Sequence, residues 1–293
     1  MQKTRVPRAT RAFTLLVLLV LLLVPARLFA HEVYILTNPE GEAGTSQEVE
    51  LFWGHFPANP DPESDYFADL PQGRLYLLHP TREEEILEMT VQEDRYVTSF
   101  TPPTGGDYQV VFSHTRGVVD WQWSEPTGEH LAQNFAKAYV HVHGDEDIEA
   151  FDAAAGLDLD MVALTDTGHL HVGMEFVGQI LYKGEPVEGA AVTLTDTEES
   201  TREVFTDEQG KFSVALEHSG SLLLKAASYE AREGSYAGAE FTGERATLSV
   251  SLATHEHDEE PPFSLRRQGI IVGSGIVFMV IALVLFKIGK KKS

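Results

Sequence analysis

The chain contains no cysteine, so it forms neither a disulfide nor a thiolate metal site, and it offers no cysteine nucleophile or c-type haem attachment. It also lacks the G-x-S-x-G, H-E-x-x-H and P-loop motifs of common hydrolases, metalloproteases and nucleotide-binding enzymes. We therefore expect a protein that is not an enzyme. Any metal site in it must use histidine, carboxylate or backbone ligands.

Basic residues are scarce in the central part of the chain. Residues 31–262 hold all 45 acidic residues but only 11 of the 22 lysines and arginines, which gives a net charge of 11 − 45 = −34. Such a field repels nucleic acid and concentrates cations near the surface. Capture of cations and a saline habitat explain this acidity equally well, because the charge is spread over the whole segment.

The N-terminus has the layout of a secretory signal peptide over residues 1–30. A positive region is followed by the apolar run Phe13–Val24, which is too short to span a bilayer comfortably. Cleavage after Ala30 is favoured because a small residue then precedes the cut. Cleavage after Ala26 and an uncleaved N-terminal anchor are the alternatives.

The C-terminus carries a second apolar segment. Gly269–Phe286 contains no charged residue and is followed directly by lysines, which mark the cytoplasmic side. This pattern predicts a transmembrane helix over residues 269–287 and a basic cytoplasmic tail over residues 288–293. We therefore expect a single-pass type I protein of the cell membrane whose ectodomain is periplasmic or extracellular.

Short strand-like runs separated by turn signals predict an all-β ectodomain. We expect two consecutive β-sandwich-like domains, over residues 31–157 and 158–252, and then an acidic, histidine-containing linker over residues 253–268. In TDEQGKFSV, Gly210 stands where a left-handed residue would close a hairpin. The stretch GEHLAQNFAKAY is compatible with a short helix or with a strand.

Histidines are the distinctive feature of the chain, and several of the 12 occur in H-x-H pairs. His141 and His143 form one pair in VHVHG. On a strand, residues i and i+2 share a face, so such a pair is able to present two imidazoles to one ion. An ordinary polar strand face is the competing interpretation. Two further pairs have the same spacing: His169/His171 and His255/His257.

His31 would be the first residue of the mature chain if cleavage follows Ala30. Its free α-amine is readily deprotonated by a metal, and amine and imidazole together form a bidentate chelate. His55, at the end of the apolar strand in LFWGHFP, is the expected partner that completes a three-nitrogen set. We predict metal ligation by His31 and His55, with His141 and His143 as auxiliary ligands.

Several segments resemble one known family. AHEVYI, VELFWGHFP, GLDLDMVALTDTGHLHVG and TDEQGKFSVALEHSG are similar to an extracytoplasmic domain-of-unknown-function family found with nickel and cobalt uptake systems. Its members include periplasmic accessory subunits of energy-coupling-factor type nickel transporters. The resemblance spans about residues 29–252 and implies a transthyretin- or carboxypeptidase-regulatory-like sandwich in the second half. It also implies a mature chain that begins at His31, and His55 as a ligand.

These features predict a membrane-anchored extracytoplasmic protein that binds Ni²⁺ or Co²⁺, with Cu²⁺ as the alternative. It would act as an accessory component of an uptake transporter, and its partner would be a metal permease served by a separate ATPase. Two other classes stay open. One is a structural or carbohydrate-binding sandwich, with Trp121 and Trp123 as a stacking platform. The other is a copper protein with a histidine brace at His31.

Overall fold

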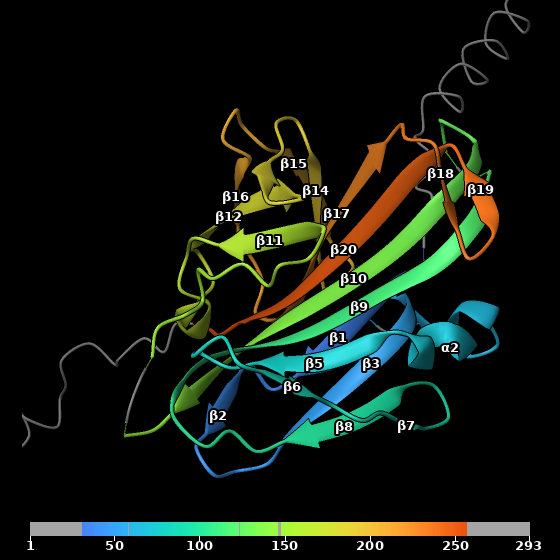
Figure 1. Ribbon diagram of the computed structural model, residues 1–293. Helices are drawn as coiled ribbons and strands as arrows, with labels where there is room; N and C mark the ends of the chain where they lie inside the picture. The colour runs from blue at the N-terminus through green and yellow to red at the C-terminus, as the bar shows by residue number, and fades with distance from the viewer. Residues whose placement is uncertain (1–30, 58, 123, 146–147, 257–293) are drawn as a thin grey trace, which may run out of the picture. The chain divides into compact units, whose positions relative to one another are not determined.

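The computed structural model describes residues 31–256, apart from residues 58, 123 and 146–147 (Figure 1). The predicted signal peptide, transmembrane helix and basic tail lie outside the described residues, as do His257 and Trp123. What is described is nearly all β-structure, so the expected all-β, sandwich-like fold is confirmed. Within this part of the chain, no helix is long and apolar enough to cross a membrane.

The elements described by the structure are mostly strands with tight connections. The helical segments are α2 (Asp65–Asp69) and the two short 3₁₀ turns η1 (Leu70–Gln72) and η2 (Thr167–His169). The strands are β1 (Glu32–Thr37), β2 (Glu40–Glu42), β3 (Gln47–His55), β4 (Asn59–Pro60), β5 (Arg74–Leu78), β6 (Glu84–Ile86), β7 (Thr90–Val91), β8 (Tyr96–Phe100), β9 (Gly106–Trp121), β10 (Gly128–His143), β11 (Leu159–Ala163), β12 (Glu175–Tyr182), β13 (Glu185–Pro186), β14 (Ala191–Asp196), β15 (Thr201–Phe205), β16 (Lys211–Ala215), β17 (Gly220–Glu230), β18 (Gly234–Tyr236), β19 (Ala239–Phe241) and β20 (Gly243–Thr254).

One long sheet organises the described chain, in the order β15-β14-β17-β20-β10-β9-β5-β6 (Figure 1). A second sheet has the order β1-β3-β8-β7, and a third has the order β11-β12-β13, with β16 added to β12. The strands β9 and β10 have 16 residues each, so GEHLAQNFAKAY is part of a strand. Because β10 pairs with β9 on one side and with β20 on the other, the long sheet continues across the predicted boundary at residue 157.

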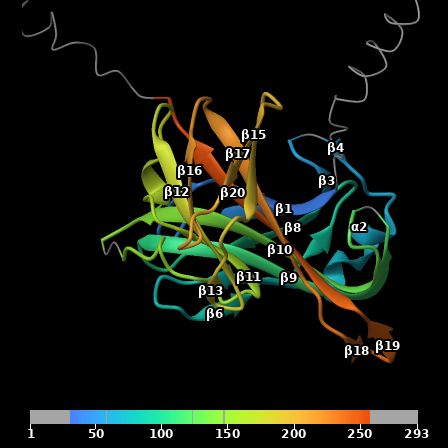
Figure 2. The ribbon, with the colours of Figure 1, turned by 90° about the horizontal axis from the view of Figure 1, so that it is seen from above.

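Both faces of the long sheet are buried where β9 crosses it. Val110 and Phe112 of β9 pack with the second sheet, whereas Val111, between them, packs with the third sheet. This alternation follows from the two-residue period of a strand. Two hydrophobic cores therefore lie on opposite faces of the long sheet (Figure 2).

The turn at Gly210 is present, but the predicted hairpin around it is wrong. Gly210 has φ +72°, in the left-handed region that favours glycine. The strands on either side of it lie in different sheets, since β15 pairs with β14 and β16 pairs with β12. A turn signal reports the local backbone only, and here the chain uses it to cross from one sheet to another.

Candidate functional site

His31 and His55 lie side by side at one end of the second sheet. The antiparallel register pairs Glu32 with Gly54 and Val33 with Trp53, so the next rung places His31 opposite His55. Their ring centroids are 4.2 Å apart, with a tilt of 39° between the ring planes. The predicted partnership of these two residues is therefore a spatial contact.

Two carboxylates hold this end of the sheet together. Glu32 accepts a hydrogen bond from the backbone N–H of Phe56 at 3.3 Å, and its other oxygen lies 3.3 Å from the Lys225 ammonium. Asp61 Oδ2 lies 3.1 Å from His31 Nε2. An imidazole whose Nε2 contacts a carboxylate is oriented by it, and its Nδ1 is the nitrogen left for a ligand.

Electrostatics favour a neutral His55. Burial lowers the pKa of the His55 imidazole, and the neighbouring His31 and Lys225 lower it further. Burial has the opposite effect on the Glu32 carboxyl, whose pKa is raised even though Lys225 counteracts the shift. A neutral imidazole is the form that ligates metals, so His55 needs no proton release at neutral pH.

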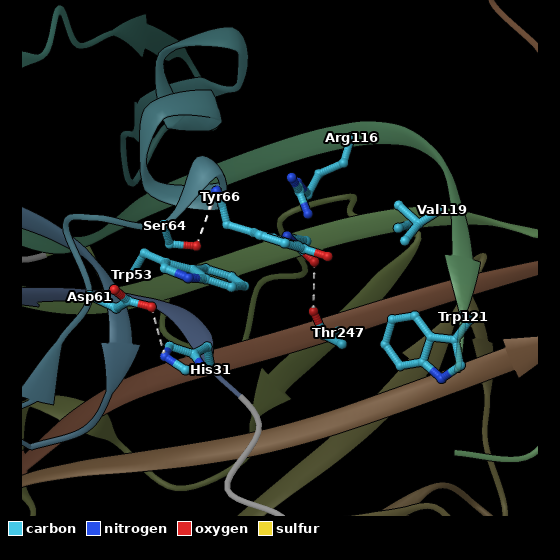
Figure 3. Close-up of a pocket in the computed structure, with 11 residues that line it drawn as sticks. His31, Trp53, Asp61, Ser64, Tyr66, Arg116, Val119, Trp121 and Thr247 are labelled. Atoms are coloured by element: carbon cyan, nitrogen blue, oxygen red, sulfur yellow. Dashed lines mark hydrogen bonds and ion pairs between the residues drawn. The ribbon is translucent and has the colours of Figure 1, made fainter. Parts of the chain in front are cut away.

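A cavity of about 270 Å³ opens beside His31 (Figure 3). One wall is a column of stacked rings: His31 lies 5.9 Å from Trp53, and Trp53 lies 4.9 Å from Tyr66. The Arg116 guanidinium continues this column, with Cζ 3.3 Å from the centre of the Tyr66 ring. The other lining residues are Asp61, Ser64, Val119, Trp121, Ala132, Asn134 and Thr247.

His141 and His143 form a second histidine cluster elsewhere on β10. Their rings are 4.9 Å apart, as expected for residues on one face of a strand, and His169 joins them at 5.4 Å from His141. His141 is buried, and its Nδ1 lies 2.8 Å from Asp107 Oδ1. This cluster is seven residues along β10 from Asn134 in the cavity wall, about 23 Å at roughly 3.3 Å per residue. The two histidine clusters therefore lie at different places in the fold.

The pair His169/His171 does not form a strand-face pair. His169 ends the turn η2, is exposed and has its Nδ1 2.7 Å from Asp166 Oδ2. His255 follows β20, and its partner lies outside the described residues. Within the described part of the chain, no three His, Asp or Glu side chains are arranged to hold a metal ion among themselves.

Sequence reasoning did not single out Tyr66 and Arg116. Tyr66 sits on the short helix α2, and Arg116 is carried by a β-bulge, so neither follows from strand alternation. His169 was noted for its spacing to His171, whereas its structural partner is His141. The only available signal for Tyr66 was an aromatic residue in an acidic loop, which is too common to single out.

The described protein is an all-β, sandwich-like protein with a histidine pair and an aromatic cavity at one sheet end. A family model described as a domain of unknown function (DUF4198) matches residues 28–230, and the chain belongs to this family. No curated protein matches it. Among solved structures, a two fibronectin type-III domain segment from chicken tenascin shares 10% identity and covers 77% of this chain and 100% of its own, at a TM-score of 0.22.

Proposed function

We propose that this protein is a membrane-anchored extracytoplasmic metal-binding protein that captures Ni²⁺ or Co²⁺ and passes the ion to a permease. The observation that carries the proposal is the contact between the His31 and His55 rings, 4.2 Å apart, with Asp61 beside His31. Histidine metal sites commonly consist of imidazoles of which one also contacts a carboxylate through its second ring nitrogen.

The terminal amine would supply the third nitrogen. With cleavage after Ala30, the α-amine and Nδ1 belong to the same residue, His31, and are therefore close enough to bind one ion. His55 adds a second imidazole. This donor set is compatible with the absence of a three-side-chain metal group among the described residues, because one donor is backbone. Nitrogen donors of this kind suit Ni²⁺ and Cu²⁺.

The context of the site supports capture and release. His31 and Asp61 have side-chain exposures of 38% and 39%, so an ion reaches them from solvent without opening the fold. The net charge of −23 raises the local cation concentration. Energy for uptake would come from a separate ATPase, since the chain carries no nucleotide-binding motif.

Copper handling is the second candidate, because the same three nitrogens would form a histidine brace for Cu²⁺. The two candidates differ in redox behaviour. Turnover of bound Cu²⁺ with a reductant would favour the copper protein, whereas tight and redox-silent binding of Ni²⁺ or Co²⁺ favours capture for uptake.

The test is a calorimetric titration of the purified mature protein with Ni²⁺, Co²⁺ and Cu²⁺. We expect His31→Ala and His55→Ala each to weaken binding by more than the roughly 10–100-fold that losing an outer-shell partner costs. His218→Ala is the matched control, because His218 pairs with Asp196 much as His31 pairs with Asp61. Unchanged affinity in both ligand variants would overturn the proposal.

A further inference from the structure

We propose that the cavity beside His31 binds a small organic carboxylate, whose anionic end pairs with Arg116 and whose flat apolar body lies between the Trp53–Tyr66 wall and Trp121. This inference goes beyond metal capture and does not depend on it. It rests on the donors of Arg116, on the bulge that places this residue, and on the aromatic walls (Figure 3).

Arg116 has more donors than the protein uses. Its side chain is only 9% exposed, and its Nη2 lies 2.9 Å from Asp69 Oδ2. Its Nε and Nη1 are buried and have no hydrogen-bond partner among the residues that the structure describes. Buried donors are normally satisfied, and a planar guanidinium matches the two oxygens of a carboxylate.

A β-bulge builds this wall of the cavity. In the β9–β10 ladder, Thr115 pairs with Gln133 and Gly117 pairs with Ala132, so Arg116 is the extra residue. Beyond the bulge, the side chains of β9 that face the cavity change from even-numbered to odd-numbered positions. For this reason Arg116, Val119 and Trp121 all line one cavity. Bulges of this kind re-aim side chains beside functional sites.

The rest of the lining suits a flat apolar body. Trp53 and Tyr66 are stacked with 11° between their planes, and Trp121 lies across the cavity from them in Figure 3. Asn134 and Thr247 already satisfy each other by a 3.1 Å hydrogen bond. A volume of about 270 Å³ lies near the lower end of the range for small-molecule sites, so the ligand is small.

The acidic groups nearby do not remove the anion preference. Asp69 engages only one nitrogen of Arg116, and Asp61 contacts His31 on the opposite part of the lining. No histidine or carboxylate of the His141 cluster lines the cavity. A cationic ligand would meet Arg116 with like charge, which gives the experiment its two arms.

The test uses two probes with the same ring, indole-3-acetate and tryptamine, titrated calorimetrically into the full chain in detergent with a metal chelator present. We expect indole-3-acetate to bind at least about tenfold more tightly than tryptamine, the difference expected from charge-assisted hydrogen bonds. Arg116→Gln should abolish this preference. Arg74→Gln is the matched control, because Arg74 also pairs with a carboxylate, that of Glu84, and lies 4.5 Å from the centre of the Tyr76 ring.

Val119→Phe provides a second variant that leaves Arg116 in place and fills the cavity. We expect it to abolish indole-3-acetate binding, and it decides the question if Arg116→Gln does not fold. Equal binding of the two probes, no binding of indole-3-acetate to the unmodified chain, or full binding by both cavity variants would overturn the inference. Because the chelator keeps the protein metal-free, failure here leaves the metal proposal standing, and failure of metal binding leaves this one standing.

Discussion

At the scale of single residues, Asp61 decides how His31 is presented. The structure places its carboxylate 3.1 Å from His31 Nε2. Asp61→Asn therefore keeps the shape of the site but weakens the contact that orients the His31 imidazole. We expect this variant to lower Ni²⁺ affinity by roughly 10–100-fold. Asp166→Asn is the control, because the Asp166 carboxylate also contacts a histidine, at 2.7 Å from His169 Nδ1. Equal affinities for the two variants would contradict this role.

Protonation distinguishes His55, in the site, from His218, outside it. Burial lowers the pKa of His55, whereas the hydrogen bond to Asp196 raises the pKa of His218 because it favours the charged ring. In metal-free protein, lowering the pH from 8 should therefore protonate His218 first and His55 later. Histidine NMR titration measures both, and protonation of His55 before His218 would contradict the electrostatics described for the site.

The site was only partly predictable from residues. His31 and His55 could be predicted, since one follows the expected cleavage point and the other ends an apolar strand. Their contact depends on the register of β1 against β3, in which positions 32 and 54 are paired, and no local pattern encodes that register. Arg116 could not be predicted, because strand alternation fails at a bulge.

At the scale of elements, the bulge in β9 depends on Gly117. This residue has φ +109°, which an L-residue adopts only with strain. Its added Cβ would meet nothing closer than Tyr236 at 4.0 Å, so crowding does not contribute. We expect Gly117→Ala to lower the free energy of unfolding by about 1–3 kcal/mol.

Urea denaturation measures this cost. Val119→Ala, in the same strand, serves as the comparison for a change that leaves the backbone unstrained. A Gly117→Ala protein that is as stable as the unmodified chain and still binds indole-3-acetate would show that the bulge does not need glycine.

The strands themselves were largely predictable from their sequences. Apolar runs such as EVELFW and YQVVFSH lie in β3 and β9, as the alternation predicts. The length of β10 was not predictable, because the polar residues of GEHLAQNFAKAY are accommodated only by tertiary partners. Lys137 is the clearest case: it is fully buried, and its ammonium lies 2.9 Å from Asp160 Oδ1.

At the scale of the whole molecule, the described residues up to Thr254 belong to one compact unit. The parallel pairing of His130–Ala138 with Gly243–Ser251 joins the two predicted domains by a continuous ladder. We therefore expect a single cooperative thermal transition for this part of the chain. Differential scanning calorimetry checks this, and two resolved transitions assignable to residues 31–157 and 158–252 would contradict it.

The central claim is that the α-amine of His31 completes the metal site. The most direct measurement compares two forms of the protein, one beginning at His31 and verified by intact mass, the other carrying an added Gly-Ser before His31. Both keep every side chain, but only the first has its amine at the site. We predict tight binding of one Ni²⁺ or Co²⁺ ion by the first form and a large loss in the second. Equal affinity of the two forms, or no binding by either, would contradict the account.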